Sequence, residues 1–379
     1  MKIIQASSYF YPHVGGVETH VLELSQCLLD MGHDVLVVCA DVPKSRPFQV
    51  MNGLPVFRFP ALDLPYIPYT YFTRRRLSEF DADVIHSHYP PPFMSYEVVQ
   101  SLPELPHLLT YHCDLELPDE ITSIRIPNTA KRIVQLINKE FYLSRILSNV
   151  GQIVVTTKSY AESSDVLRGH QYQIIPNGIR LEAFDALSRD ISAEKQAKQI
   201  LFVGRLSSVK GVEYLIEAAK MVLDHQSDAT FLIVGEGEER ERLKTLARGY
   251  EAQIQFCGHL PQRALVTLYR TSTLLVLPSF TRLEAFGLVL LEAMASETPV
   301  VASRIPGVLD VVGDGGLLVK PQDSLELANA ILEILSNPRK ARAMGENGRR
   351  LVESKYNWRI IARKILDVYR NIMDMSMKL

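Results

Sequence analysis

Two glutamates, Glu284 and Glu292, lie close together in the apolar stretch EAFGLVLLEAM. Ionised carboxylates are rarely buried without a partner, so an apolar run that contains two of them suggests a polar ligand. If a helix begins near Gly287, Glu284 lies just before it and Glu292 lies roughly 8 Å along its axis. Free amides of the first helical turn then lie between two carboxylates, which accept hydrogen bonds from hydroxyl groups. This layout fits a diphosphate with hydroxyl groups on both sides, as in a nucleotide sugar.

Positive charge and backbone amides for phosphate are predicted at two other places. GRLSSVKG puts Arg205 just past a predicted strand, and Lys210 opens the next helix. Taken alone, that pair is explained equally well as a solvated turn. Gly15 and Gly16 lie between the first strand and a helix, where missing side chains let an anion approach the positive end of the helix dipole. Because all of these positions follow predicted strands, we expect them at the carboxyl ends of the sheets.

Other phosphate-binding motifs fit this sequence poorly. The candidate for a dinucleotide turn, GEGEER, has Arg240 in place of the third glycine and three glutamates where phosphate needs positive charge. A Walker loop is absent because no G-K-S or G-K-T triplet occurs. We therefore do not expect a nicotinamide, flavin or P-loop nucleotide site.

No pattern typical of a metal site is found either. The four cysteines lie far apart without a C-x-x-C pair, which argues against structural zinc and disulfides and favours core packing in a reducing cytosol. The D-x-D at 81–83 precedes a predicted strand and is most simply a polar turn.

Short apolar runs alternate with stretches of helical period, which is typical of βαβ units. After PNGI at 176–179 and a charged stretch, the pattern starts again, so we predict an α/β fold of two doubly wound domains with a ligand cleft between them. The predicted strands lie within 2–10, 33–40, 83–89, 107–112, 152–157 and 172–177, and then within 199–206, 229–237, 253–260, 273–280, 299–305 and 315–321.

The overall composition describes an ordinary globular protein. Of 379 residues, 47% are hydrophobic and 22% are charged, and the formal net charge of −2 offers no general attraction to nucleic acid or anionic membranes. Neither a cleavable signal sequence nor an apolar span of membrane length is evident, so we expect a cytoplasmic protein, attached at most to the inner membrane surface.

Taken together, the motifs resemble those of the retaining glycosyltransferases of family 4. They are E-x-F-G-L-x-x-x-E from Glu284, G-R-L-x-x-x-K-G from Gly204, P-N-G-I at 176–179 and Y-P-x-x-G-G-V-E from Tyr11, in the order and spacing of that family. The resemblance covers essentially the whole chain. It implies the GT-B fold, with Rossmann-like domains at 1–177 for the acceptor and 178–358 for the nucleotide sugar, and a helix in 359–379 that crosses back to the first domain.

The resemblance also implies roles for the motif residues. Glu292 would bind the ribose hydroxyls of the donor and Glu284 a hydroxyl of its sugar. His112, in LLTYHCD, matches a histidine beside the donor sugar, although an ordinary hydrogen-bonded core histidine explains it too. The implied catalytic residues are His112, Arg205, Lys210 and Glu284, and the implied donor-binding residues are Gly15, Gly16, Phe286, Gly287, Leu288, Val289 and Glu292.

The implied reaction moves a hexosyl group from a UDP- or GDP-sugar to a hydroxyl of a glycan, lipid or lipid-linked acceptor. No carboxylate is an evident nucleophile, so we favour same-face attack, in which the acceptor proton passes to the departing phosphate oxygen. No metal or other cofactor is expected, because Arg205 and Lys210 supply positive charge. The alternatives are a nucleotide-sugar epimerase or a phosphorylase of similar fold, or a nucleotide-binding module without catalysis.

Two basic, aromatic-rich segments suggest contact with an anionic membrane surface. The first, YIPYTYFTRRRL, contains Tyr66, Tyr69, Tyr71, Phe72, Arg74, Arg75 and Arg76. The second, 131–147, is basic at Lys131, Arg132, Lys139 and Arg145 and apolar at Ile133, Leu136, Ile137 and Phe141. Its pattern also fits an amphipathic helix that covers the sheet, which is the interpretation we favour from sequence.

Overall fold

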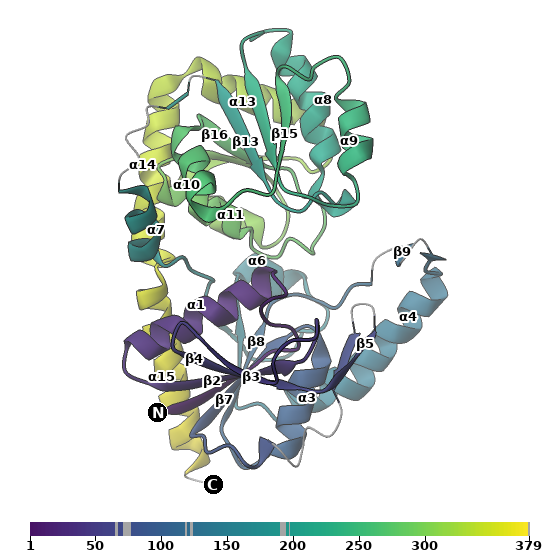
Figure 1. Cartoon of the computed structure of the whole chain (residues 1–379), viewed down its shortest axis with the longest axis vertical. Coiled ribbons are helices and arrows are strands. Elements are labelled where there is room, and N and C mark those ends of the chain that lie inside the picture. Colours follow the sequence, from purple (N-terminus) through teal and green to yellow (C-terminus); the bar gives the residue numbers. More distant parts are fainter. Residues whose placement is uncertain are drawn as a thin grey trace. The chain divides into compact units, whose positions relative to one another are not determined.

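The computed structural model describes residues 1–64, 67–70, 77–117, 120–121, 124–189, 195–196 and 198–377. The chain divides into two compact units, Met1–Pro176 with Trp358–Leu379, and Asn177–Asn357 (Figure 1). Both borders lie one residue before the joints expected from sequence. Each unit is a doubly wound α/β fold built on a largely parallel sheet, so the predicted fold class is confirmed.

The sheet of the first unit has the strand order β12-β11-β8-β7-β1-β2-β4-β3. Its predicted strands are all present, and the unit adds the antiparallel pair β3–β4 at the edge and two small hairpins, β5–β6 and β9–β10. Their bounds are β1 (Lys2–Ala6), β2 (Asp34–Ala40), β3 (Phe48–Met51), β4 (Leu54–Phe59), β5 (Ala61–Leu64), β6 (Ile67–Thr70), β7 (Val84–Tyr89), β8 (His107–Tyr111), β9 (Glu120–Ile121), β10 (Ile124–Arg125), β11 (Gln152–Val155) and β12 (Gln173–Ile174).

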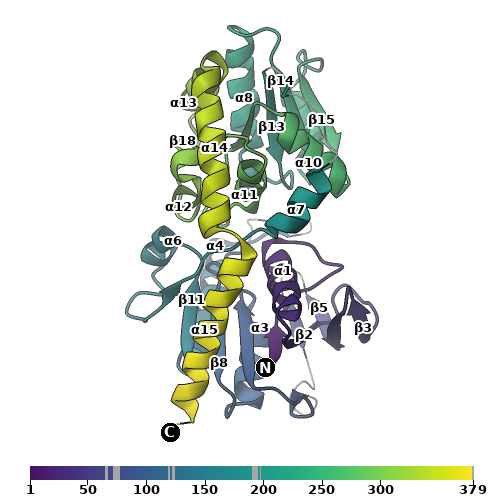
Figure 2. The same cartoon turned by 90° about the vertical axis from the view of Figure 1, so that its left-hand side faces the viewer.

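The last helix, α15 (Trp358–Ser376), completes the core of the first unit. Its buried residues Trp358, Ile361 and Ile365 pack with Val21 and Leu24 of α1 (Gly16–Asp30). Figure 2 shows α15 beside β8 of the same unit. The other helical segments here are α3 (Pro92–Ser101), α4 (Asn128–Ile137), the π-helical turn η1 (Asn138–Leu143), α5 (Ser144–Leu147) and α6 (Lys158–Ser163). Among the helices described, none combines the length and the apolar character needed to cross a bilayer.

The sheet of the second unit is wholly parallel, with the order β15-β14-β13-β16-β17-β18. All its strands were predicted: β13 (Gln199–Val203), β14 (Thr230–Val234), β15 (Ile254–Gly258), β16 (Leu274–Leu277), β17 (Val300–Ser303) and β18 (Gly316–Val319). Helices cover both faces: α7 (Leu181–Ser188), η2 (Ser208–Lys210), α8 (Val212–Leu223), α9 (Arg240–Leu246), α10 (Gln262–Thr271), α11 (Leu288–Ala295), α12 (Val308–Val312), η3 (Gly313–Gly315), α13 (Ser324–Ser336) and α14 (Pro338–Lys355).

Strand order identifies where each unit is expected to bind a ligand. In the second unit the chain runs from β13 outward to β15 and then returns to β16 on the other side of β13. In the first unit β1 lies between β2 and β7 in the same way. Ligands of open α/β sheets bind at the carboxyl ends of strands at such points of reversal.

Candidate functional site

The second unit brings a lysine and a glutamate together at its point of reversal. Lys210 Nζ, on the turn before α8, lies 2.5 Å from Oε2 of Glu284, on the loop between β16 and α11. Ser279 Oγ donates to the same carboxylate oxygen at 3.0 Å. Both charged side chains are largely buried, with 26% of Lys210 and 13% of Glu284 exposed. The sequence predicted both residues separately and missed Ser279, whose place at the carboxyl end of a buried strand was its signal.

These contacts fix the Glu284 carboxylate while leaving it capacity to bind a ligand. An ionised carboxylate offers about four lone-pair positions, and Lys210 and Ser279 both donate to one of its oxygens. Glu284 can therefore accept a further hydrogen bond from a ligand hydroxyl. A cationic lysine beside it offers an anionic ligand a partner in the same place.

Arg205 lies in an exposed ion pair. Its Nη2 and Nε lie 3.1 and 3.3 Å from Oε2 of Glu238, one of the three glutamates of the GEGEER loop. Pairs this exposed contribute little to stability. Arg205 can consequently exchange Glu238 for a phosphate at low cost.

The GEGEER loop supports the loop that carries Arg205. Leu206 N donates to Glu236 O at 2.8 Å, and Glu239 N donates back to Leu206 O at 3.0 Å. A Cβ on Gly235 would lie 1.9 Å from Gly204 O, so this approach requires glycine. Glycine in this motif therefore lets two neighbouring loops approach closely. The loops are neighbours because β13 and β14 pair in the sheet.

Glycine also sets the start of the helix that carries Glu292. Gly287 caps α11 with φ 78° and ψ 64°, in the left-handed region, and the helix begins at Leu288 as the sequence predicted. Glu292 Oε2 accepts a hydrogen bond of 2.5 Å from the Tyr269 hydroxyl. Burial, and then the Glu292 carboxylate, raise the pKa of Tyr269 well above its usual value, so this hydroxyl stays a donor. The carboxylate of Glu292 is thus held in one place.

Gly211 lets the turn that carries Lys210 lie close to the loop that carries Glu284. Its φ is 65°, and an added Cβ would lie 2.3 Å from Pro278 O. Gly211→Ala should therefore push the Lys210 turn away from the 278–287 loop and lower the free energy of unfolding by roughly 1–3 kcal/mol. Gly249→Ala is the matched control for thermal unfolding, because Gly249 has φ 89° but open space around it. Equal losses in both variants would show that only backbone strain, and not the contact with Pro278, matters.

In the first unit, Gly15 and Gly16 lie at the start of α1, where the sequence predicted them. Gly15 is the N-cap in an extended conformation. The carboxylate of Glu18 folds back over it, so that an added Gly15 Cβ would lie 2.5 Å from Glu18 Oε2. His13 Nδ1 lies 3.2 Å from the other oxygen of this carboxylate. A negative side chain thus already lies beside these glycines, and an incoming phosphate has to displace it.

His112 follows β8 and is buried among other histidines. Its Nε2 lies 3.1 Å from Nδ1 of His88, and Nε2 of His88 lies 2.8 Å from Oε1 of Gln5. Because an amide oxygen only accepts, His88 donates from Nε2, and its Nδ1 accepts from His112. Burial lowers the pKa of both histidines well below the usual value, so both are neutral. The Nδ1 atom of His112 remains an acceptor, which suits a ligand hydroxyl.

The same chain of hydrogen bonds reaches helix α15. Gln5 Nε2 donates to the Tyr369 hydroxyl at 3.1 Å, and that hydroxyl lies 2.7 Å from Nδ1 of His86. Nε2 of His86 in turn lies 2.6 Å from Oγ1 of Thr110. The environment of His112 is therefore that of the hydrogen-bonded core histidine which the sequence left open as the alternative. The Gln5, His88 and Tyr369 partners were not predicted.

One group among the described residues has the geometry to hold a metal ion. A ligand atom from each of the buried residues His20, His88 and His112 lies within 4.8 Å of the other two. Neutral imidazole is a good ligand for zinc and similar metals. The hydrogen bonds of His88 to Gln5 and His112 occupy both its ring nitrogens, so a metal ion bound by His88 would have to replace one of these two bonds.

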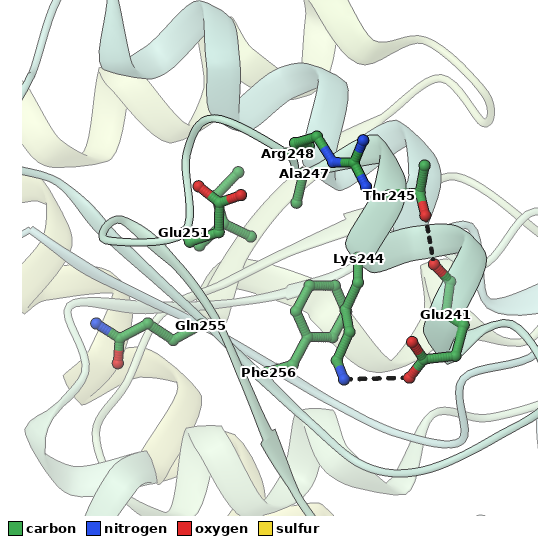
Figure 3. Close-up of a pocket in the computed structure, with 9 residues that line it drawn as sticks. Glu241, Lys244, Thr245, Ala247, Arg248, Glu251, Gln255 and Phe256 are labelled. Atoms are coloured by element: carbon green, nitrogen blue, oxygen red, sulfur yellow. Dashed lines mark hydrogen bonds and ion pairs between the residues drawn. The ribbon is translucent and has the colours of Figure 1, made fainter.

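A hollow of about 530 Å³ lies between α9 and β15, away from the predicted residues (Figure 3). Lys244 crosses its rim to pair with Glu241 at 3.1 Å, and Thr245 donates to the Glu241 carbonyl. Its floor includes Phe256. Of the charged groups drawn in Figure 3, Lys244 and Glu241 pair with each other. Since no predicted site residue lines the hollow, we assign it no ligand.

Two family models, both of glycosyltransferases, match successive parts of the chain. The model described as Glycosyltransferase Family 4 matches residues 14–183, and the model described as Glycosyl transferases group 1 matches residues 184–351. An uncharacterized glycosyltransferase of Methanocaldococcus jannaschii is 29% identical, with 99% of each chain covered. A phosphatidyl-myo-inositol mannosyltransferase of Mycobacterium leprae is 28% identical, with 100% of this chain and 99% of the relative covered.

Solved structures with a similar fold match nearly the whole length of this chain. Sucrose-phosphate synthase of Thermosynechococcus elongatus superposes with a TM-score of 0.77 at 26% identity, covering 99% of each chain. The Anabaena protein HepE in complex with UDP-glucose has a TM-score of 0.72 at 19% identity, covering 98% of this chain and 100% of that one, which shows the shared fold.

Proposed function

The chain belongs to glycosyltransferase family 4, and from this premise we propose that it transfers a hexosyl group from a UDP- or GDP-sugar to an acceptor hydroxyl with retention of configuration. The observation that carries the proposal is the fixed Lys210–Glu284–Ser279 cluster at the carboxyl ends of β13 and β16. It combines a cation for phosphate with a carboxylate for sugar hydroxyls, which are the groups that a nucleotide sugar presents.

The relatives support the donor and acceptor classes in this proposal. One relative over the full length is a phosphatidyl-myo-inositol mannosyltransferase, whose name states transfer of mannose to a lipid. A protein of the same fold binds UDP-glucose. We therefore include both UDP- and GDP-sugars as donors, and a glycan, lipid or lipid-linked hydroxyl as acceptor, in the cytoplasm or at the inner face of the membrane.

Each site residue has a defined task in the proposed reaction. Glu284 accepts a hydrogen bond from the transferred sugar, and Glu292 accepts hydrogen bonds from the ribose. Lys210 and Arg205 stabilise the negative charge that grows on the departing nucleoside diphosphate, which lowers the transition state more than the ground state. The amides at the start of α11, from Phe286, Gly287, Leu288 and Val289, bind sugar and phosphate oxygens.

In this proposal the first unit contributes a hydrogen-bond acceptor and backbone amides. His112 Nδ1 accepts a hydrogen bond from a sugar hydroxyl, and the backbone amides of Gly15 and Gly16 donate hydrogen bonds to the diphosphate after Glu18 has moved aside. The acceptor hydroxyl attacks on the face from which the diphosphate leaves, and its proton passes to the leaving phosphate oxygen. Because Lys210 and Arg205 supply the positive charge, we propose that no metal ion takes part.

Binding of nucleotides and slow hydrolysis of donors test the proposal directly. UDP or GDP should raise the midpoint of thermal unfolding, since a ligand that binds only the folded state stabilises it. The matching UDP- or GDP-sugar, incubated without acceptor, should slowly release free nucleoside diphosphate, at the same rate with and without a chelator. A protein that binds a nucleotide but never cleaves its sugar would be a binding module, and loss of cleavage in chelator would refute metal-independent transfer.

A further inference from the structure

Helix α4 exposes its apolar side. Ile133, Leu136 and Ile137 recur at the spacing of one helical face, yet 58%, 59% and 51% of these residues are exposed. No residue of α4 is buried. In Figure 1, α4 extends outward from the sheet of its unit, and α3 contacts both strand β6 and the η1 turn that follows α4. The interpretation favoured from sequence, a helix whose apolar side covers the sheet, is therefore wrong.

The exposed apolar area continues onto neighbouring elements. Phe141, in the π-helical turn after α4, is 45% exposed and lies 6.0 Å from the ring of Tyr96 on α3. Phe93 of α3 contacts Tyr142 at 5.2 Å and Tyr69 at 5.8 Å. We call the exposed apolar residues of this area the α4 surface: Leu62, Tyr69, Ile133, Leu136, Ile137 and Phe141. A contiguous apolar surface on one side of a domain indicates a binding partner.

Basic residues flank the α4 surface. Arg132 and Lys139 lie on the helical segment itself and are exposed, whereas Lys131 lies on the side of Val134 and Asn138, which faces the protein. Arg145 lies 4.2 Å above the Phe141 ring and donates to the Tyr96 hydroxyl at 3.0 Å. Glu140 is the one acid among residues 128–147. This positive charge is local, since the chain as a whole has a formal net charge of −2.

We propose that the α4 surface docks the protein on an anionic lipid bilayer. An apolar helix face with lysine and arginine at its borders is the chemistry of a helix that lies in the membrane interface. Its apolar side chains enter the acyl region, while the basic side chains reach the anionic headgroups. Tyrosines at the border fit the same layer, because each has an apolar ring and a polar hydroxyl. This inference goes beyond glycosyl transfer and stands whether or not the chain is a transferase.

Of the other segment suggested from sequence, 66–77, Tyr69 is the residue that contributes to the α4 surface. Tyr66, Tyr71, Phe72, Arg74, Arg75 and Arg76 lie outside the described residues. The inference rests on residues 128–147 and on the β5–β6 hairpin and α3 beside them.

Flotation with lipid vesicles tests the inference on the full chain. The protein should float with vesicles that contain phosphatidylglycerol, much less with pure phosphatidylcholine vesicles, and less as salt is added. Arg132→Gln with Lys139→Gln should weaken binding to anionic vesicles by about 25-fold, at roughly fivefold per charge. Leu136→Gln with Ile137→Gln should weaken it by roughly tenfold or more for each side chain.

Matched controls separate specific docking from general effects. Phe48→Gln with Val50→Gln removes two exposed apolar residues from β3 of the same unit, and Arg363→Gln with Lys364→Gln removes two exposed charges from α15. Both control proteins should float like the original. Failure of the original protein to float would overturn the inference, as would equal loss in the controls. Concentration-dependent dimers that disappear in the Leu136→Gln, Ile137→Gln variant would assign the surface to a second copy instead. Donor hydrolysis, measured without lipid, should be unchanged in all four variants.

Discussion

Lys210→Ala is expected to slow donor hydrolysis on the order of 10²–10³-fold, because it removes a cation that stabilises the departing diphosphate. The same change should weaken nucleotide binding much less, since the charge on the phosphates grows during the reaction. The rate of nucleoside diphosphate release and the nucleotide dissociation constant, measured on one preparation, give the two effects.

Two further variants serve as controls: Lys244→Ala, and Lys210→Ala combined with Glu284→Ala. Lys244 lies in the same unit and also pairs with a glutamate, but it lies at the hollow of Figure 3, so Lys244→Ala should keep full activity. Lys210→Ala alone leaves the largely buried Glu284 without its cation, which costs stability. Adding Glu284→Ala should restore stability but not activity. A Lys210→Ala protein that is folded and fully active would remove this lysine from the mechanism.

Acid is expected to destabilise the first unit at pH values where carboxylates are still ionised. Burial lowers the pKa values of His86, His88, His107 and His112 from the usual 6.5, that of His107 to about 3. Below pH 6.5 the unfolded chain therefore binds protons that the folded unit does not, so the free energy of unfolding falls as the pH falls. The slope is up to about 1.4 kcal/mol per pH unit for each histidine, and carboxylates add to it only below about pH 5.

The single tryptophan provides a local measurement of this effect. Trp358 is buried in the first unit, with its ring 5.0 Å from that of His20, so its fluorescence in denaturant titrations reports on this unit. His107→Gln should reduce the slope between about pH 6.5 and 5 by up to 1.4 kcal/mol per pH unit. The exposed His170 is the control, and His170→Gln should leave the slope unchanged. A free energy of unfolding that is flat over this range in the original protein would contradict the prediction.

The sequence predicted the buried parallel strands well, because both faces of such strands are apolar. It missed β4, since this strand contains Pro55 and Arg58. Arg58 is nonetheless buried, and its guanidinium donates to the carbonyls of Arg46 and Tyr11 at 3.0 and 2.7 Å. A buried arginine whose partners are carbonyls distant in sequence has no local pattern, so nothing in the segment itself indicates a buried strand.

The sequence predicted which residues belong to the site and that they follow strands, but it did not predict which of them contact one another. Lys210 and Glu284 are 74 residues apart, and they meet because β16 pairs with β13, which no local pattern reveals. For α4, periodicity predicted the helix correctly but could not tell whether its apolar side faces protein or lipid, because both environments favour the same spacing.

The place of α15 has a consequence for how the chain emerges from the ribosome. The sheet of the first unit is translated early, but the helix that covers Val21 and Leu24, and brings Tyr369 to Gln5, is made only after the whole second unit. At roughly 5–20 residues per second this delay is on the order of ten seconds or more. Throughout that interval the nascent first unit presents an apolar surface and unmatched polar groups. Such a nascent chain is a natural client for chaperones that hold exposed apolar surfaces.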